Sequence, residues 1–388
     1  MPRQPRREDY TVGWVCALPI ELAAARMMLD EEHLDLEHNT ADNDENLYTL
    51  GSVSGHNVAI ICLPTSQIGN NPAAAVATQM QAIFTNIRFG LMVGIGGGVP
   101  SAGPDVRLGD VVVASQFHDT FFGVIQYDIG KTTPGDVKRK GSLNPPPRIL
   151  LSAVAQVRAR DLRGRSQLSQ HISRLESIAE FQRANAGPDV LFKAAYNHER
   201  GDTCDQCSFE GQQPRLLRES EEEVTVHYGT IASGNQVIKD ATQRDRVSAE
   251  LGGVLCFEME AAGLIHSFPC LVIRGISNYA DSHKNYKWQA YAAGTAAAYA
   301  KELLAVISPA EVMDTCRAED AMRSKDEHYR QSSPFDHASR KRIKTVISEG
   351  SESGSVDGLA HELSRTLLND EQRQSLLDSL RFDQIDAR

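Results

Sequence analysis

The sequence predicts an α/β protein whose central sheet, mostly parallel or mixed, is covered by helices on both faces. One observation is that short apolar segments of strand length recur along the chain, for example at 11–18, 90–95 and 270–276. The other is that segments of helical length, several of them rich in alanine, lie between these strands. Buried strands that alternate with helices are typical of such a sheet, because both of its faces must be covered.

The amino-terminal part of the chain supplies the first elements. A buried strand is expected at 11–18, and a helix at 21–29 follows Pro19, a residue that fits the first turn of a helix. The further elements expected before residue 128 are a hairpin of strands at 47–53 and 57–63, a helix at 73–84, and strands at 90–95 and 110–115.

The pattern weakens between about 128 and 224, and we interpret this stretch as an insertion with part of its length in flexible loops. Helices are expected within it at 149–160 and 171–182. The elements expected after it are strands at 224–233, 254–258 and 270–276, and helices at 240–251, 261–267 and 286–307.

The composition changes after Pro309, which predicts a domain at 1–308, a flexible linker at 309–358 and a helical segment at 359–388. The linker is rich in Ser, Gly and charged residues and has few apolar ones. The last segment regains a helical spacing of leucines, and an amphipathic helix needs a partner surface. We therefore expect the helical segment to lead into a further domain.

The bulk composition argues against several classes of protein. The 388 residues carry a formal net charge of −11, and on average this charge would repel a nucleic acid. No apolar run approaches the roughly 20 residues of a membrane span, so a cytoplasmic protein without membrane contact is expected. The seven cysteines do not suggest a disulfide scaffold in a chain of this length.

Candidate site residues follow the strands, because ligands of open α/β sheets bind at the carboxyl ends of strands. Glu21 follows the first strand, where a carboxylate can activate water as a general base. The alternative is a solvated glutamate in the first helical turn, which the helix dipole favours. The run Gly94-Ile95-Gly96-Gly97-Gly98 fits either a turn or a loop that brings backbone close to a ligand. No Gly-Lys-Ser/Thr follows it, so it is not a phosphate loop.

Two later strand ends also carry polar side chains. Glu258 and Glu260 flank Met259, and carboxylates near a core need donors such as the hydroxyls of a ribose. The alternative is an acidic first turn of the next helix. Ser277 and Asn278 close the strand at 270–276, and here the alternative is a turn in which Asp281 caps the next helix.

Taken together and in this order, these segments resemble the nucleoside phosphorylase superfamily, and within it the methylthioadenosine/S-adenosylhomocysteine nucleosidases, over about 10–307. The resemblance implies a three-layer α/β/α fold with a central mixed, partly barrel-like sheet, a purine substrate, no cofactor and a homo-oligomer. The chain also resembles the nucleosidase-type effector domain of fungal NLR-like proteins. In such proteins a linker that resembles 376–383 precedes a NACHT-type ATPase module.

Carried over residue by residue, the resemblance implies a role for each candidate. Glu21 matches the acid that activates the attacking water. Ser277 and Asn278 match a Ser-Asp pair whose Asp gives a proton to N7 of the purine. Ribose contacts are implied for Glu260, Met259, Glu258, Gly96 and Gly97, and base contacts for Asn235, Gln236, Val237 and Ile238.

Asn278 departs from that pattern, because an amide can donate a hydrogen bond but cannot give up a proton. The loss of a general acid costs on the order of 10²–10⁴ in rate. We therefore expect a weakened enzyme, a variant that traps its substrate, or an enzyme for a purine that tolerates an amide at N7.

Hydrolysis is favoured over phosphorolysis, because a phosphate site calls for arginines and Glu21 would repel a phosphate. The nearest arginine, Arg88, is expected at the far end of its strand. The expected substrate is an adenine nucleotide such as ATP, or adenosine. If they converge, the residues that would hold a 5′-phosphate chain are Lys239, Arg244, Arg246, Arg107 and His118; otherwise each is a surface charge.

The spacing His198-x5-Cys204-x2-Cys207 is compatible with zinc. A fourth ligand would have to come from elsewhere, for example from His227, so loop thiols without a metal are the expectation. Other functions stay open beside hydrolysis: a phosphate-dependent purine nucleoside phosphorylase, a nucleotide sensor that binds without cleaving, and a pure assembly module.

Overall fold

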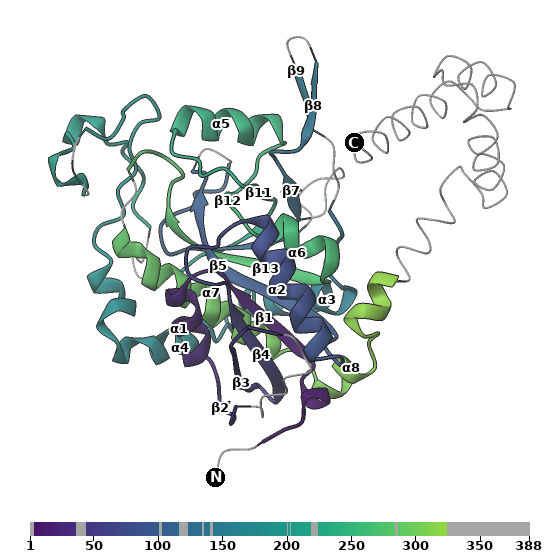
Figure 1. Cartoon of the computed structure of the whole chain (residues 1–388). Helices are drawn as coiled ribbons and strands as arrows, with labels where there is room; N and C mark the ends of the chain where they lie inside the picture. The colour runs from purple at the N-terminus through teal and green to yellow at the C-terminus, as the bar shows by residue number, and fades with distance from the viewer. Residues whose placement is uncertain are drawn as a thin grey trace, which may run out of the picture. The chain divides into compact units, whose positions relative to one another are not determined.

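The computed structural model describes residues 4–35, 44–100, 103–115, 123–133, 136–139, 143–199, 201, 203–218, 224–283 and 286–323. Residues 1–322 form one compact unit (Figure 1). The helical segment expected at 359–388, the linker from 324 onward and His118 lie outside the described residues.

A mixed sheet of eleven strands forms the centre of this unit. Its middle strands, β1 (Val12–Cys16), β5 (Phe89–Gly98) and β13 (Cys270–Asn278), run in parallel. The main path of the sheet, in spatial order, is β10 (Val226–Gly229), β6 (Val111–Ala114), β13, β5, β1, β4 (His56–Cys62), β3 (Tyr48–Val53) and β2 (Glu31–Glu32). β3 and β4 are antiparallel neighbours, which confirms the predicted hairpin.

The sheet branches at the carboxyl end of β5. There Gly97 and Gly98 pair antiparallel with β12 (Cys256–Glu258), while β13 stays paired with the other edge of the strand. β12 pairs with β11 (Ile231–Ser233), and β11 pairs with β7 (Val124–Gln126). The sheet is mixed, as expected, and the branch does not close it into a barrel.

Helices form the two outer layers, as Figure 1 shows. One face shares its core with α1 (Pro19–Met27), α3 (Arg148–Asp161), α4 (Leu168–Ser173) and α7 (Gln289–Leu304). The other face shares its core with α2 (Asn70–Ile83) and α6 (Ala261–Ser267). Because side chains alternate along a strand, Trp14 packs in the first core and its neighbour Val15 packs in the second. The predicted three-layer α/β/α architecture is confirmed.

Two predicted elements divide into shorter ones. The strand expected at 224–233 is split into β10 and β11 at Thr230, because β10 pairs with β6 whereas β11 pairs with β12 and β7. The helix expected at 171–182 is also wrong in its extent. α4 ends at Ser173, and short 3₁₀ turns follow it at Arg174–Ser177 and Ala179–Phe181. These turns bury Leu175 and Phe181 in the core that contains α7.

The stretch 128–224 is only partly an appendage. Its helix α3 buries Leu150, Val154 and Val157 in the core beneath the sheet, and α4 packs against α7. β8 (Gly130–Thr133) and β9 (Asp136–Arg139) form a separate hairpin that projects from the main body in Figure 1. The apolar stripes of α3 and α4 therefore belong to the domain itself.

The packed unit continues past the boundary predicted at residue 308. α8 (Pro309–Met313) buries Val312 completely, and Ala318 is also fully buried and donates its N–H to the carbonyl of Ile87 at 2.8 Å. The linker prediction is therefore wrong for 309–322, because this stretch carries apolar side chains that the domain covers. Within the described part of the chain, no helix is long and apolar enough to cross a membrane.

α5 (Ala241–Glu250) covers the branch of the sheet. The side chain of Asp240 accepts the N–H groups of Thr242 and Gln243 and so caps the helix. Val247 packs in a small core with Phe257 from β12.

Candidate functional site

A cavity of about 230 Å³ opens where β1, β5 and β13 end and α1 begins. The segments that line it are separated widely in the sequence. They are the start of α1, the glycine run of β5, residues 236–238, the turn between β12 and α6, and the end of β13. The cavity therefore collects most of the candidates that the sequence places at strand ends.

Glu21 is buried beside this cavity, with 3% of its surface exposed. Its Oε2 accepts the backbone N–H groups of Ala17 and Leu18 at 2.6 and 3.0 Å, and its Oε1 accepts the N–H of Ile95 at 2.8 Å. Burial raises the pKa of this carboxyl, although the charge of Arg274 and the three N–H groups act in the opposite direction. The solvated alternative is wrong, and the geometry suits a fixed base that takes a proton from water.

The glycine run lies within β5 and not in a turn. β5 continues to Gly98 because its last residues pair with β13 on one edge and with β12 on the other. A Cβ atom on Gly94 would overlap Oε1 of Glu21 and lie 2.6 Å from Nη1 of Arg274. Glycine at this position therefore lets both charged groups approach the strand, and Gly96 and Gly97 form the wall of the cavity from backbone.

Gly94→Ala is expected to destabilise the fold by about 1–3 kcal/mol, which is the usual cost of overpacking a buried position. The added methyl group must displace Glu21 or Arg274. The free energy of unfolding in urea measures the change. Gly96→Ala is the matched comparison, because its Cβ would meet no atom nearer than 3.2 Å. An equal loss of stability in both variants would contradict the assignment.

Arg274 lies fully buried in β13 and is the centre of charge in this region. Its Nη2 donates to Oε2 of Glu258 and, at 3.2 Å, to Oε2 of Glu260. Burial alone would lower the pKa of Arg274, but the carboxylates of Glu258, Glu260 and Glu21 raise it above its usual value. Three carboxylates surround one guanidinium, so the group has a net negative charge when all four side chains are ionised.

Glu258 and Glu260 have different surroundings. Glu258 accepts the backbone N–H groups of Glu260 and Ala261 in addition to the guanidinium of Arg274. The described hydrogen bonds of Glu260 involve Oε2, which leaves Oε1 for a ligand. Burial raises the pKa of Glu260 to about 7, Arg274 opposes this shift, and the charges of Glu258 and Glu21 add to it. Glu258 therefore holds Arg274 and the turn before α6 in place, and Glu260 is the group able to bind hydroxyls.

Ser277 and Asn278 lie at the end of β13, on the edge of the cavity. Nδ2 of Asn278 donates to Oγ of Ser277 at 3.1 Å, and Oδ1 of Asn278 accepts the N–H of Ala280 at 2.9 Å. The hydroxyl of Ser277 donates to the carbonyl of Gly96 at 3.4 Å. Both polar ends of the amide are thus held by this chain, which fixes its orientation.

The segment expected to bind a base forms another part of the wall. Ile238 is buried, whereas Val237 is 45% exposed and lies where a planar ring can stack on it. The carbonyl of Gln236 accepts the hydroxyl of Tyr127. Tyr127 also meets Phe257 edge to face, with 5.5 Å between the ring centres. Phe257 lines the cavity, so an apolar slot lies between the two segments.

Asn235 does not line the cavity, in contrast to the other three residues of its segment. Its Oδ1 accepts the N–H of Asn70 at 3.1 Å, and its own N–H donates to Asp128 at 2.8 Å. Asn235 therefore anchors the segment to the start of α2.

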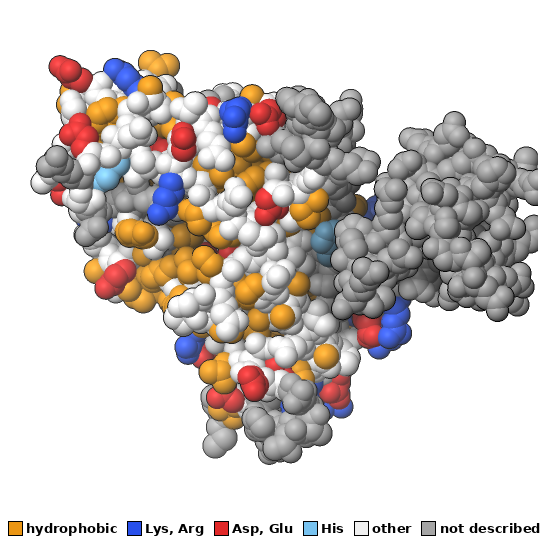
Figure 2. Space-filling model, turned by 45° about the horizontal axis from the view of Figure 1, so that its top comes forward, with side chains coloured by type: hydrophobic (Ala, Val, Ile, Leu, Met, Phe, Trp, Pro, Cys, Tyr) orange, Lys and Arg blue, Asp and Glu red, His pale blue; other side chains and the backbone are white. Residues whose placement is uncertain are grey.

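The cations expected to hold a phosphate chain do not converge on this cavity. Arg107 lines a separate cavity of about 490 Å³. Arg244 is buried and donates to the carbonyl of Tyr279 at 2.8 Å, while Lys239 and Arg246 are exposed. None of the described residues that line the cavity is a lysine or an arginine. On the face drawn in Figure 2, Lys and Arg side chains are scattered singly among acidic ones.

His227 is not close to the two cysteines of the insertion. It lies in β10, where its Nε2 is 2.8 Å from Oδ2 of Asp110. Another histidine, His283, brings a ring nitrogen to within 4.8 Å of ligand atoms of His198 and Cys207.

Several residues in and around the cavity were not assigned a role from the sequence. Arg274, which does not line the cavity itself, had a recognisable signal, because an arginine within an apolar strand must be paired when the strand is buried. Leu18, Ile68, Ala280 and Gln289 do line the cavity. Their residue types are common in packed proteins, and no local pattern distinguishes them.

Comparison with known proteins gives a consistent result. The family model described as the phosphorylase superfamily matches residues 11–308. A nucleotide-binding leucine-rich repeat (NLR)-like protein of Hyaloscypha variabilis is 48% identical over 305 residues, which are 78% of this chain and 30% of that protein. The chain thus spans less than a third of this relative.

Two further relatives are named for an activity. A 5′-methylthioadenosine/S-adenosylhomocysteine nucleosidase of Mycobacterium bovis is 25% identical, and the match covers 76% of this chain and 96% of that protein. The ATP nucleosidase Cap17 of Escherichia coli is 24% identical over 72% of this chain and 48% of that protein.

A solved structure shows the same fold. It is the 5′-methylthioadenosine/S-adenosylhomocysteine nucleosidase of Neisseria meningitidis in complex with methylthio-immucillin-A. The TM-score is 0.50 at 17% identity, over 76% of this chain and 99% of that chain.

Proposed function

The chain belongs to the phosphorylase superfamily, and on that premise we propose that its cavity hydrolyses the N-glycosidic bond of a purine nucleoside or nucleotide. The observation that carries the proposal is the cluster of Glu21, Glu258 and Glu260 around Arg274. The sugar becomes oxocarbenium-like as this bond breaks, and preorganised negative charge stabilises it.

The same charge favours water over phosphate as the attacking group. A phosphate dianion would need free cations near Glu21, and the described lining residues provide none. Arg88 lies at the opposite end of β5, where it donates to the carbonyl of Thr315. This position agrees with the expectation from the sequence.

In the proposed reaction, Glu21 accepts a proton from water while the water oxygen attacks C1′ of the sugar. The bond between C1′ and the base nitrogen breaks, and its electron pair remains with the base. Asn278 donates a hydrogen bond to N7, and solvent supplies the proton that the leaving base requires. Glu260 accepts hydrogen bonds from the ribose hydroxyls, Met259 packs on the sugar, and Val237 stacks on the purine.

The proposed substrate carries adenine, as ATP or as adenosine. Support comes from the relatives, since one is named as an ATP nucleosidase and another acts on 5′-methylthioadenosine and S-adenosylhomocysteine. Ile68 and Val237 line the cavity and are 48% and 45% exposed, so the cavity is open to solvent beside them and can accommodate a substituent that extends outward.

Product analysis tests the reaction. The full chain is incubated separately with ATP, adenosine, methylthioadenosine and inosine, each with and without phosphate, and free base is measured by chromatography. We expect adenine to be released at a rate independent of phosphate. Base release that requires phosphate would replace the hydrolase with a phosphorylase. Tight binding without base release would favour a nucleotide sensor.

Affinity for the nucleoside is expected to rise between about pH 6 and about pH 8. The pKa of Glu260 is about 7, so its carboxyl is mostly protonated below this value and mostly ionised above it. Ionisation makes Oε1, the oxygen that is left for a ligand, a charged and therefore stronger acceptor for the ribose hydroxyls. Calorimetric titration at several pH values measures the dissociation constant. The dependence should disappear in Glu260→Gln, and an unchanged slope in that variant would contradict the role.

We also propose that this enzyme is a cytoplasmic effector domain of a longer immune-type protein with a NACHT-type module, and that it forms a homo-oligomer. The support is the NLR-like relative, of which the matching region is less than a third. Light scattering on the chain measures its oligomeric state, and a monomer at all concentrations would contradict the last point.

A further inference from the structure

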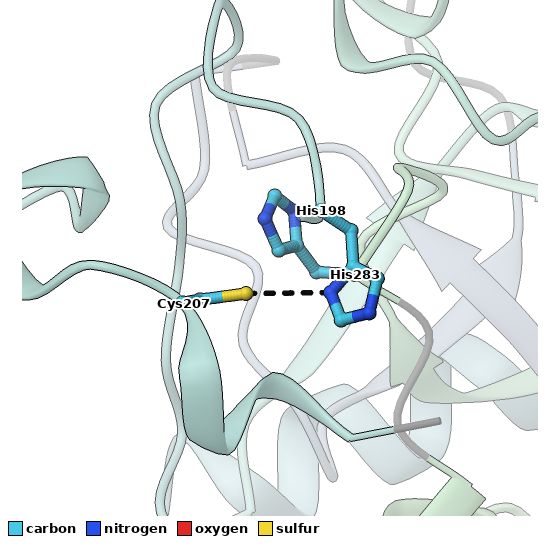
Figure 3. A group of neighbouring side chains, drawn as sticks. All are labelled: His198, Cys207 and His283. Atoms are coloured by element: carbon cyan, nitrogen blue, oxygen red, sulfur yellow. Dashed lines mark hydrogen bonds between the residues drawn. The ribbon is translucent and has the colours of Figure 1, made fainter. Parts of the chain in front are cut away.

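Two thiols and two imidazoles gather near the loop that follows β13, in a group that the proposed reaction does not use. Nδ1 of His198 lies 3.3 Å from Sγ of Cys207 and 4.0 Å from Sγ of Cys204. A ring nitrogen of His283 lies within 4.8 Å of the ligand atoms of His198 and Cys207. Figure 3 shows the side chains of these three residues close together. His198 and the cysteines come from the insertion, whereas His283 comes from the loop after β13.

His283 is the member of this group whose ring nitrogens indicate a further ligand. It is only 7% exposed, and neither of its ring nitrogens has a hydrogen-bond partner within the described structure. Its ring is stacked on that of Phe192, with 3.9 Å between centres, so the imidazole is held in place. A buried and unsatisfied polar group costs free energy, and a metal ion would give one nitrogen a partner.

His198 is prepared for metal binding by its second nitrogen. Its Nε2 lies 2.8 Å from the carbonyl oxygen of Gly201, so this nitrogen must carry the proton and donate it. In the neutral ring Nδ1 then carries no proton, and it is the nitrogen that lies beside the two thiols. A backbone carbonyl that fixes the tautomer in this way is typical of histidines that bind metals. Asp281 gives His283 a similar neighbour, with Oδ2 at 3.6 Å from Nδ1.

We propose that His198, Cys204, Cys207 and His283 bind one zinc ion with tetrahedral geometry. Two thiolates and two imidazoles are a common ligand set for structural zinc, and Cys-x2-Cys is a common spacing. Nitrogen and sulfur ligands of a tetrahedral zinc ion lie about 3.5 Å apart. The two distances from Nδ1 of His198 to the thiols, 3.3 and 4.0 Å, are close to this value, and the nitrogen of His283 lies within 4.8 Å of the ligand atoms of His198 and Cys207. Each thiol releases its proton to solvent when it binds the ion.

The site would fasten the insertion to the loop that carries the end of β13. His283 follows Asn278 by five residues, and the N–H of His198 already donates to Oγ of Ser282 at 2.9 Å. A cavity of about 240 Å³ lies between the two segments, and both Cys204 and Asn278 line it. Zinc would therefore act at a distance from the reaction, by holding in place the loop after Asn278.

The first test uses the full wild-type chain, purified without added metal or chelator. Elemental analysis should find one zinc ion per chain. After exchange with Co²⁺, thiolate-to-cobalt charge-transfer bands and strong visible bands of tetrahedral cobalt should appear. Chelation should then expose two additional thiols to a colourimetric thiol reagent. A folded wild-type chain that holds no zinc and gives no cobalt bands would overturn the proposal, as would a disulfide between Cys204 and Cys207.

Variants test the ligands one by one. Cys207→Ser and His283→Gln should each lose the zinc, whereas Cys316→Ser, at an exposed free cysteine, should retain it. Circular dichroism shows whether each variant is folded. Full zinc content in a folded His283→Gln variant would overturn the proposed ligand set.

Discussion

Glu21→Gln is expected to lower the rate of base release by about 10²–10⁴-fold, the usual contribution of a general base. An amide cannot take the proton of the attacking water. Both oxygens of Glu21 also accept backbone N–H groups, so the NH₂ group of glutamine would oppose at least one donor. Single-turnover release of adenine measures the rate, and calorimetry measures binding, which should change less.

Glu180→Gln is the control for this substitution, because Glu180 is exposed and does not line the cavity. It should release base at the wild-type rate. A Glu21→Gln variant that kept the wild-type rate while remaining folded would exclude Glu21 as the base.

Asn278→Asp is expected to raise the rate by about 10²–10⁴-fold, because it restores a general acid. The aspartate can keep the existing contacts, with one oxygen accepting the N–H of Ala280 and the other near Oγ of Ser277. The surrounding carboxylates and burial should raise the pKa of the new carboxyl, so that it holds a proton to give to N7. Chromatography of both forms with ATP and adenosine measures the change.

Asn185→Asp, on the exposed surface, adds the same charge away from the cavity and should leave the rate unchanged. If Asn278→Asp were folded and released base no faster than the wild type, the amide at this position would not limit the rate of base release. A loss of activity would show that the amide is adapted to its own substrate.

The order and type of most elements could be predicted, because they depend on local patterns. The hairpin β3–β4 and the helix α6 follow from apolar segments and from the turns between them. The errors arose where distant partners set the limits. The break at Thr230 reflects a change of partner strand, and β5 is longer than predicted because two other strands pair with its glycines.

The candidate site also has a part that could be predicted from the sequence and a part that could not. Glu21 and Asn278 line one cavity because the carboxyl ends of the parallel strands β1 and β13 meet at one edge of the sheet. Glu260 reaches the same cavity from the turn after β12, which runs antiparallel to β5. The direction of a side chain on a helix cannot be predicted in this way, and Arg244 is directed to the carbonyl of Tyr279. The proximity of His283 to Cys207 could not be predicted from the sequence, because a long stretch of chain separates the two residues.

The glycine wall of the cavity has a consequence for how this protein can diversify. Where main-chain atoms form the wall, there are no side chains to exchange, and a Cβ atom on Gly97 would lie 2.9 Å from the Cβ atom of Ala280. The rim is different, because Ile68 and Val237 are about half exposed and their side chains can change without disturbing the core. Descendants of one ancestral enzyme could therefore exchange the molecules they recognise by rim mutations alone, while the bond-breaking apparatus is inherited intact.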